Sequence, residues 1–216
     1  MDFVGPVDLF TGVCWPGFFV ARGERKRGGH RGETPSTREL GKLVDMKAPI
    51  RRADPREPLV AAMIGEHLAE MAPTAPSDSR HAYPAAALSE AGIALYAAEH
   101  QGRPVALGAL HFFAPGRAEL KSMRTDVAHR SQGLGRSMLD HLIDVARRGG
   151  IREILLETGT HPQFAPARAM YAAAGFEPCA PFDGYCDDPH SVYLRLGLTV
   201  VDAQGCTSKI VTSEGR

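Results

Sequence analysis

The sequence feature that most constrains this chain is a glycine-bearing turn, VAHRSQGLGR at residues 127–136, between an alternating strand pattern and an amphipathic helix pattern. Gly133 and Gly135 allow the backbone to turn tightly and to approach a ligand closely. The first N–H groups of the following helix have no acceptor within it, and they lie at the positive end of its dipole. Such a turn is a pocket for phosphate, and Arg130 and Arg136 add positive charge beside it.

Two familiar phosphate-binding loops do not match these letters. A Walker A loop needs glycine where Arg130 stands and lysine where Arg136 stands. A dinucleotide-binding fingerprint needs glycine or alanine where Met138 stands. The turn therefore predicts a phosphate site of another kind.

Regular patterns surround the turn on both sides. The segment Asp54-Pro55-Arg56-Glu57 has an N-cap carboxylate followed by proline, which predicts a helix start, and apolar residues from Leu59 to Met71 continue at helical spacing. A second helix is expected over residues 136–148, because apolar residues form one stripe along it. The other expected elements are strands at 49–52, 93–99, 104–113, 118–127, 152–157 and 191–196, and helices at 84–90 and 166–174.

The order of these elements predicts the fold class. A meander of three strands followed by a β-α-β unit gives an α/β (α+β) fold, with a mixed, mostly antiparallel sheet and helices on both faces. Along the third strand of the meander, Glu119, Lys121, Met123 and Thr125 alternate in sequence. We therefore expect these four side chains on one face of the strand.

The composition is that of an ordinary globular domain, with 44% hydrophobic and 23% charged residues in a chain of 216. Basic and acidic residues balance at 25 each, so the overall charge gives no reason to expect nucleic acid or a membrane surface as a partner. The sequence contains no run of about 18 apolar residues that predicts a transmembrane helix. Four cysteines without CxxC spacing fit a reducing compartment, so a cytoplasmic protein is expected.

The two ends of the chain differ in texture from its middle. Residues 22–33, RGERKRGGHRGE, carry charge and glycine without an apolar anchor, so residues 1–45 are expected to form a disordered extension. The alternative is a basic arm that touches nucleic acid or a partner. One domain is expected over residues 46–198, and residues 199–216 either add a strand or form a tail.

At the turn, the sequence resembles the GNAT superfamily of N-acetyltransferases, whose pyrophosphate loop is written (Gln/Arg)-x-x-Gly-x-(Gly/Ala). Residues 130–135, RSQGLG, match that motif fully. Residues 167–176, ARAMYAAAGF, are similar to the family's A-x-x-x-Y-x-x-x-G-F signature and come in the expected order. The resemblance covers residues 50–196. Further strings, such as ELKSMRT at 119–125, are similar to a subset of members whose substrates are not established.

The resemblance implies acetyl-CoA as cosubstrate, held where the strands at 119–127 and 151–157 splay apart. The pantetheine arm would pair with the backbone of Met123, Thr125 and Val127. The pyrophosphate would bind the turn and the start of the helix. The residues implied there are Arg130, Gln132, Gly133, Leu134, Gly135, Arg136 and Ser137.

The implied chemistry is direct attack of a neutral amine on the thioester carbonyl. A carboxylate must first take the proton that an ammonium carries at neutral pH, and Glu119 and Glu157 on the two splayed strands are the candidates, with Glu119 favoured. A backbone N–H near the end of the fourth strand would stabilise the oxyanion. Tyr171 stands where many family members have a tyrosine that protonates the leaving thiolate. The alternative is that its ring only packs against the sheet.

The acceptor is less constrained than the donor. Lys121, Arg124 and His161 are candidates for binding a carboxylate on a small amino compound, with structural salt bridges as the alternative. No metal is expected, because the nine histidines lack HxxxH or HxH spacing.

The expected function is therefore acetyl-CoA-dependent acetylation of a primary amine of a small molecule. Two alternatives stay open. One is a noncatalytic acyl-CoA-binding module that senses CoA, and the other is an acetyltransferase that acts on a protein partner. Homodimers are common among such proteins, but nothing in the sequence locates an interface.

Overall fold

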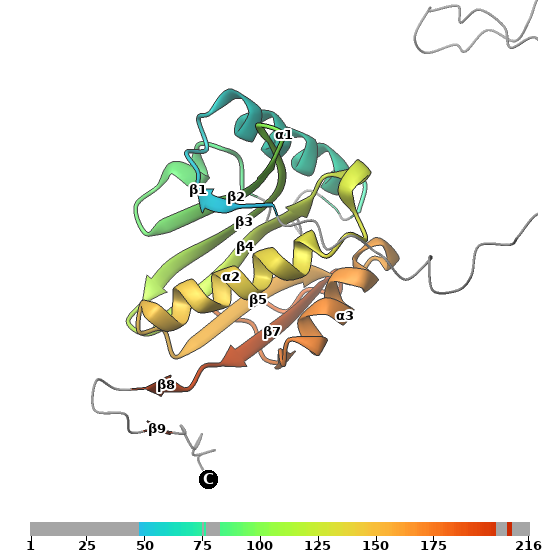
Figure 1. Ribbon diagram of the computed structural model, residues 1–216. Helices are drawn as coiled ribbons and strands as arrows, with labels where there is room; N and C mark the ends of the chain where they lie inside the picture. The colour runs from blue at the N-terminus through green and yellow to red at the C-terminus, as the bar shows by residue number, and fades with distance from the viewer. Residues whose placement is uncertain (1–47, 75, 77–82, 202–206, 209–216) are drawn as a thin grey trace, which may run out of the picture. The chain divides into compact units, whose positions relative to one another are not determined.

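The computed structural model describes residues 48–74, 76, 83–201 and 207–208, and the expected extension at residues 1–45 lies outside these ranges. Seven strands form one sheet in the order β1-β2-β3-β4-β5-β7-β6 (Figure 1). Their bounds are β1 Ile50–Arg52, β2 Ile93–His100, β3 Arg103–Ala114, β4 Arg117–Thr125, β5 Glu153–Gly159, β6 Glu177–Pro178 and β7 Ser191–Gly197. Strands β8 (Val200–Val201) and β9 (Thr207–Ser208) pair only with each other, so the chain after β7 adds no strand to the main sheet within the described residues.

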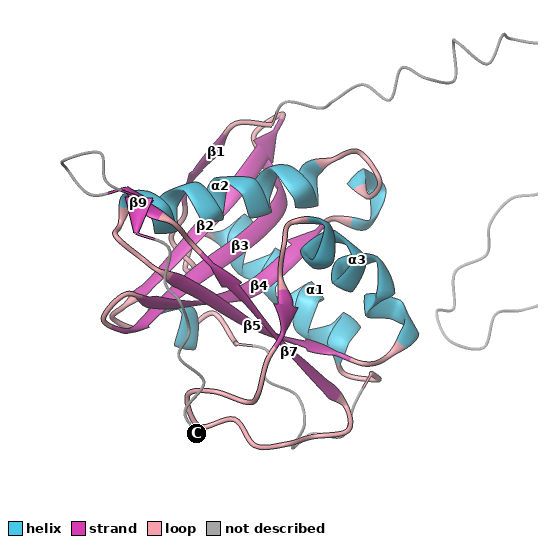
Figure 2. Ribbon diagram, turned by 90° about the horizontal axis from the view of Figure 1, so that it is seen from below, coloured by secondary structure: helices cyan, strands magenta, loops and turns pink. Residues whose placement is uncertain are grey.

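Helices cover both faces of the sheet. The α-helices are α1 Pro58–Met71, α2 Leu134–Arg148 and α3 Ala165–Ala173, and three 3₁₀ turns are η2 Ala87–Ser89, η3 Val127–His129 and η4 Pro162–Phe164. One buried cluster joins apolar residues of α2 and α3 to one sheet face, and a second joins α1 to the other (Figures 1 and 2). The predicted fold class is confirmed: all the strand pairs are antiparallel except β4 with β5. No helix of the described residues has the length and apolar character needed to cross a membrane.

The first helix begins three residues later than its sequence predicts. Asp54 and Glu57 use their side chains on each other's turn: Asp54 Oδ1 accepts from the Arg56 N–H at 2.9 Å, and Glu57 Oε1 accepts from the Asp54 N–H at 2.8 Å. These bonds close a separate turn, and Pro58 rather than Pro55 opens α1. The predicted apolar stripe was also wrong at Leu59, whose side chain is 46% exposed.

The strands β4 and β5 separate along their length. They pair in parallel only from Arg117 with Glu153 to Glu119 with Leu155. Strand β4 then continues to Thr125 and β5 to Gly159, outside that pairing. The splayed strand pair is therefore confirmed, and it opens a gap in the sheet on the carboxyl side of Glu119.

A β-bulge in β4 overturns the prediction that four alternating side chains share one face. Ser122 has a φ of +52°, and the β3 register moves from Ala109 opposite Lys121 to Leu107 opposite Arg124. The extra residue reverses the alternation. Arg124 therefore joins Lys121 on the face covered by α1. Met123 packs against the α2 cluster instead, on the other face. Thr125 is also on that other face, beside Gly135.

Gly108 on β3 allows α2 to approach the sheet closely. A Cβ at this position would lie 2.7 Å from Leu142 Cδ1, 2.8 Å from Met123 Sδ and 2.9 Å from Met138 Cγ. Gly108→Ala is therefore expected to lower the free energy of unfolding by about 1–3 kcal/mol, as overpacked cores do. Chemical denaturation would measure it. Gly65→Ala is the control: it has open space on helix α1 and is expected to stabilise by up to about 1 kcal/mol.

Candidate active site

The glycine-bearing turn forms where β4 ends and α2 begins. Asp126 stops the strand: its Oδ1 accepts from the Ala128 N–H at 3.1 Å and lies 2.7 Å from His129 Nδ1. Ser131 and Gly133 then take left-handed φ values of +61° and +80°, and Gly133 is the N-cap of α2. This places the start of α2 at the open end of the splayed strands.

The amides at the start of α2 face a cleft of about 440 Å³, which we call the turn cleft. Its lining includes Gly133, Leu134 and Gly135 of the turn, Thr125 of β4 and Tyr171 of α3. The first three N–H groups of a helix have no acceptor within it, so those of residues 134–136 can receive an anion. The phosphate pocket predicted from the sequence is thus beside an open cleft.

The predicted cofactor residues divide into two groups. Met123, Thr125, Arg130, Gly133, Leu134, Gly135 and Arg136 line the turn cleft, whereas Val127, Gln132 and Ser137 do not. Val127 follows the end of β4, starts η3 and is 62% exposed, so it cannot extend the strand as predicted. The Gln132 side chain bonds back to the Ala128 carbonyl at 3.2 Å. The Ser137 N–H is already donated to the Gly133 carbonyl at 2.9 Å.

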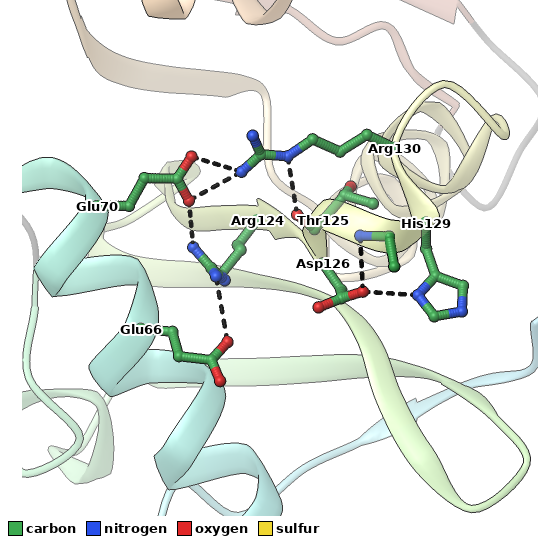
Figure 3. Close-up of polar contacts among 8 residues, drawn as sticks. Glu66, Glu70, Arg124, Thr125, Asp126, His129 and Arg130 are labelled. Atoms are coloured by element: carbon green, nitrogen blue, oxygen red, sulfur yellow. Dashed lines mark hydrogen bonds and ion pairs between the residues drawn. The ribbon is translucent and has the colours of Figure 1, made fainter. Parts of the chain in front are cut away.

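The cationic side chains of the site are held by helix α1 (Figure 3). Glu70 bonds Arg130 through both carboxylate oxygens at 2.6 and 2.8 Å, and it bonds Arg124 at 2.6 Å. Glu66 adds a contact to Arg124 at 3.2 Å. Although burial opposes it, the two guanidinium groups hold the pKa of Glu70 below its ordinary value. Arg124, predicted as a substrate ligand, is therefore a buried ion-pair partner of α1.

The sequence did not identify these α1 residues as part of the site. Glu66, His67, Glu70 and Met71 fall at i, i+4 spacings along one strip of the helix, and three of them line the turn cleft. The polar members of this strip were the available signal, but a solvated helix face has the same pattern. Only the packing of α1 over β4 shows which strip faces the cleft.

His67 is the titrating group of this strip. Its pKa is lowered to about 4, chiefly by burial and then by Arg124 and Arg130, against the opposing effect of Glu70. The unfolded chain takes up this proton near pH 6.5 while the folded protein refuses it, so stability falls as the pH drops from about 6.5 towards 4. The variant His67→Gln is expected to lose less stability than the wild type between pH 7 and pH 5, by up to about 2 kcal/mol. Urea titrations at the two pH values measure the difference, and equal losses would contradict the prediction.

A smaller pocket of about 90 Å³, the inner pocket, lies where β4 and β5 splay. It shares Tyr171, Met123 and His67 with the turn cleft, and it adds both predicted carboxylates. Glu119 is 3% exposed. Glu157 lies on the opposite strand, and its Oε1 accepts from Ser191 Oγ at 2.7 Å. The gap in the sheet thus brings the two candidate bases to one pocket.

Glu119 is part of a buried hydrogen-bonded cluster. Its Oε1 accepts from Lys121 Nζ at 2.8 Å and from the Tyr185 hydroxyl at 2.7 Å, and Lys121 Nζ lies 3.0 Å from that hydroxyl. Burial and the neighbouring Glu119 carboxylate raise the pKa of Tyr185. Tyr185 was not predicted as a site residue, because it comes from the loop before β7, more than 60 residues from Glu119 in sequence.

Tyr171 is 5% exposed and lines both the turn cleft and the inner pocket. Its ring packs on Phe176 at a centroid distance of 5.7 Å. Burial, and secondarily the charge of Glu157, raise the pKa of its phenol. The hydroxyl therefore keeps its proton at neutral pH, which is the state that a proton donor needs.

His161, the third predicted substrate ligand, is outside both pockets. It is exposed and is the N-cap of η4, where its Nδ1 accepts from the Gln163 N–H at 3.3 Å. Among the described residues, His111, Glu119 and Asp183 could each offer one metal-ligand atom, all within 4.8 Å of one another. Sequence spacing did not suggest this group, because the three residues come from different elements. The ammonium of Lys121 on Glu119 opposes a cation there.

Comparison with known proteins agrees with this geometry. The model of the acetyltransferase (GNAT) family matches residues 60–176. The uncharacterized N-acetyltransferase YsnE of Bacillus subtilis (strain 168) is 35% identical over 139 residues, which are 64% of this chain and 92% of that protein.

Two solved structures extend the comparison. A Klebsiella pneumoniae protein, whose acyl-CoA N-acyltransferase activity is itself inferred, is 28% identical with a TM-score of 0.59 over 71% of this chain and 99% of its own. The PaiA N-acetyltransferase of Thermoplasma acidophilum, solved in complex with coenzyme A, shares the fold at 15% identity, with a TM-score of 0.55 over 71% and 100% of the two chains. With its glycine turn at the mouth of a splayed sheet and a family match over more than half its length, the chain belongs to the GNAT family of N-acetyltransferases.

Proposed function

We propose that this acetyltransferase transfers the acetyl group of acetyl-CoA directly to the primary amine of a small molecule. The observation that carries the proposal is the junction of two spaces: the turn cleft, lined by the unpaired amides of α2, opens through Tyr171 and Met123 into the inner pocket between the splayed strands. A diphosphate at the first space would place a thioester near the second. The small volume of the inner pocket favours the amine end of a small acceptor.

Glu119 is proposed to take the acceptor's proton, and Tyr171 to protonate the leaving thiolate. Glu119 is within the inner pocket, and Tyr185 and Lys121 bond the carboxylate oxygen and fix its orientation. Tyr171 borders both spaces, as a group must that acts on the sulfur between them. Glu157 remains the alternative base from the opposite strand.

The proposed phosphate partners are the amides of residues 134–136 together with Arg130 and Arg136. In this structure the guanidinium of Arg130 is bound to Glu70, and that of Arg136 to Asp140 at 2.9 Å. A phosphate bound at the turn would compete with these two carboxylates for the same donors. We therefore propose that part of the binding energy for the donor comes from the exchange of these ion pairs.

The test is a thiol-release screen of the full chain with acetyl-CoA against amino acids, polyamines, aminoglycosides and peptides. Sustained thiol release with at least one small amine is the expected result. Tight acetyl-CoA binding with no thiol release above the level without acceptor, for every amine tested, would instead identify a noncatalytic acyl-CoA sensor. Release only with peptides would move the acceptor to a protein partner.

A further inference from the structure

Lys121 is exceptional in the composition of the folded domain. The chain has 20 arginines but only five lysines, and Lys121 is the single lysine among the described residues, which contain thirteen arginines. The other lysines are Lys26, Lys42, Lys47 and Lys209. A guanidinium does not lose its proton in proteins, whereas a lysine ammonium can, and it then becomes a nucleophilic amine. The described fold thus has one side-chain amine able to act as an acyl acceptor.

That amine is at the reaction centre. The Lys121 side chain is 6% exposed and lines the inner pocket together with Tyr171 and both candidate bases. Its Nζ lies 4.0 Å from the centroid of the Tyr83 ring and 5.5 Å from that of Tyr185. These rings hold the amine beside the pocket rather than in bulk water.

A proton acceptor for the amine is already in place. Glu119 Oε1 lies 2.8 Å from Lys121 Nζ, within hydrogen-bond distance. The same carboxylate is the one proposed to deprotonate the acceptor. An acceptor amine that occupies the inner pocket would separate Lys121 from the thioester, and an empty pocket leaves Lys121 as its resident amine.

We propose that Lys121 is a self-acetylation site, modified by the enzyme's own acetyl-CoA when no acceptor fills the inner pocket. The proposal rests on the proposed function, because it uses the same donor and base. The ammonium gives one proton to Glu119, the Nζ–C bond forms at the thioester carbonyl, and the C–S bond breaks. CoA leaves as its thiol, with a proton from Tyr171, and the proton on Glu119 passes to water.

The product would be a neutral amide and would not turn over. Acetylation removes the positive charge that pairs with Glu119, whose carboxylate is otherwise 3% exposed, and it adds an acetyl group to a small pocket. Unpaired buried carboxylates are costly, so the modified site would lose its arrangement. We therefore expect one acetylation per chain, after which the reaction without acceptor stops.

The experiment incubates the full chain with acetyl-CoA alone and follows thiol release, intact mass and tryptic peptides. Trypsin cleaves after Arg117, Lys121 and Arg124 in the native sequence, and acetylation of Lys121 leaves the peptide at residues 118–124 uncut. The expected result is one equivalent of thiol and that peptide with one acetyl group. Lys121→Arg should abolish both, and Glu119→Gln should slow the reaction by about 10²-fold if the carboxylate takes the proton.

Two controls keep the outcomes distinct. Gly133→Val, which should weaken acetyl-CoA binding, is expected to slow Lys121 acetylation at least about tenfold, whereas chemical acetylation would be unchanged. Equal modification of all five lysines would overturn the inference. Thermal melts of each variant check that it is folded. Calorimetry separates the two hypotheses: acetyl-CoA binding and transfer to an acceptor with Lys121 unmodified would refute self-acetylation alone, whereas no binding would refute the proposed function.

Discussion

Replacing Tyr171 with phenylalanine is expected to lower the turnover number by about 10²-fold while leaving the affinity for acetyl-CoA nearly unchanged. The substitution removes only the hydroxyl, so the ring keeps its packing on Phe176. Since the raised pKa keeps the phenol protonated, its loss removes the proton available to the thiolate. The effect appears only as the C–S bond breaks. Steady-state thiol release with the best acceptor from the screen, combined with calorimetry of acetyl-CoA binding, measures the two quantities.

The matched control is Tyr96→Phe. Tyr96 is on β2, its ring contacts His141 at a centroid distance of 4.9 Å, and it lines neither the turn cleft nor the inner pocket. Its variant should keep the wild-type turnover number. A Tyr171→Phe enzyme with unchanged turnover would remove Tyr171 from the proposed mechanism and leave it as a packing residue.

A valine at position 133 is expected to raise the dissociation constant for acetyl-CoA by at least about tenfold. Gly133 has a φ of +80°, a conformation that costs an ordinary L-residue roughly 1–2 kcal/mol and a β-branched one more. Relief of that strain would turn the amides of residues 134–136 away from the cleft. The added side chain would also block the close approach of a phosphate to the backbone. Calorimetric titration with acetyl-CoA measures the change.

Gly150→Val separates backbone strain from ligand binding. Gly150 has a similar φ of +73°, but it follows the opposite end of α2 and lines neither pocket. Both variants should lose stability in thermal melts, and only Gly133→Val should lose affinity. Equal affinities for acetyl-CoA in the wild type and Gly133→Val would show that the turn does not bind the diphosphate.

Local sequence signals predicted most of the architecture because each depends on neighbouring residues. The alternation in β2 and β3, the apolar stripe of α2 and the glycine pair of the turn each describe a short stretch of backbone. Their order then limited the topology to a meander followed by a β-α-β unit. Errors arose where a side chain redirected the chain locally: Asp126 ended β4 before Val127, and Glu57 delayed the start of α1.

The site was less predictable because its partners are distant in sequence. Arg124 and Arg130 looked like free cations for a ligand, but Glu70, more than 50 residues earlier, bonds both. Lys121 looked like a carboxylate ligand, but the loop before β7 brings Tyr185 to its ammonium. The spacing of charges along one strand does not reveal such contacts.

The sequence by itself determined the fold class, the phosphate-binding turn and the identity of the family, since these depend on periodicity and on residues within one short segment. The tertiary structure alone decided which charges are paired and which side chains meet at the gap between β4 and β5. The physical reason is the bulge at Ser122 and the packing of α1 and the loop before β7. One extra residue reverses the faces of β4, and elements far apart in the chain supply the groups that neutralise its buried charges.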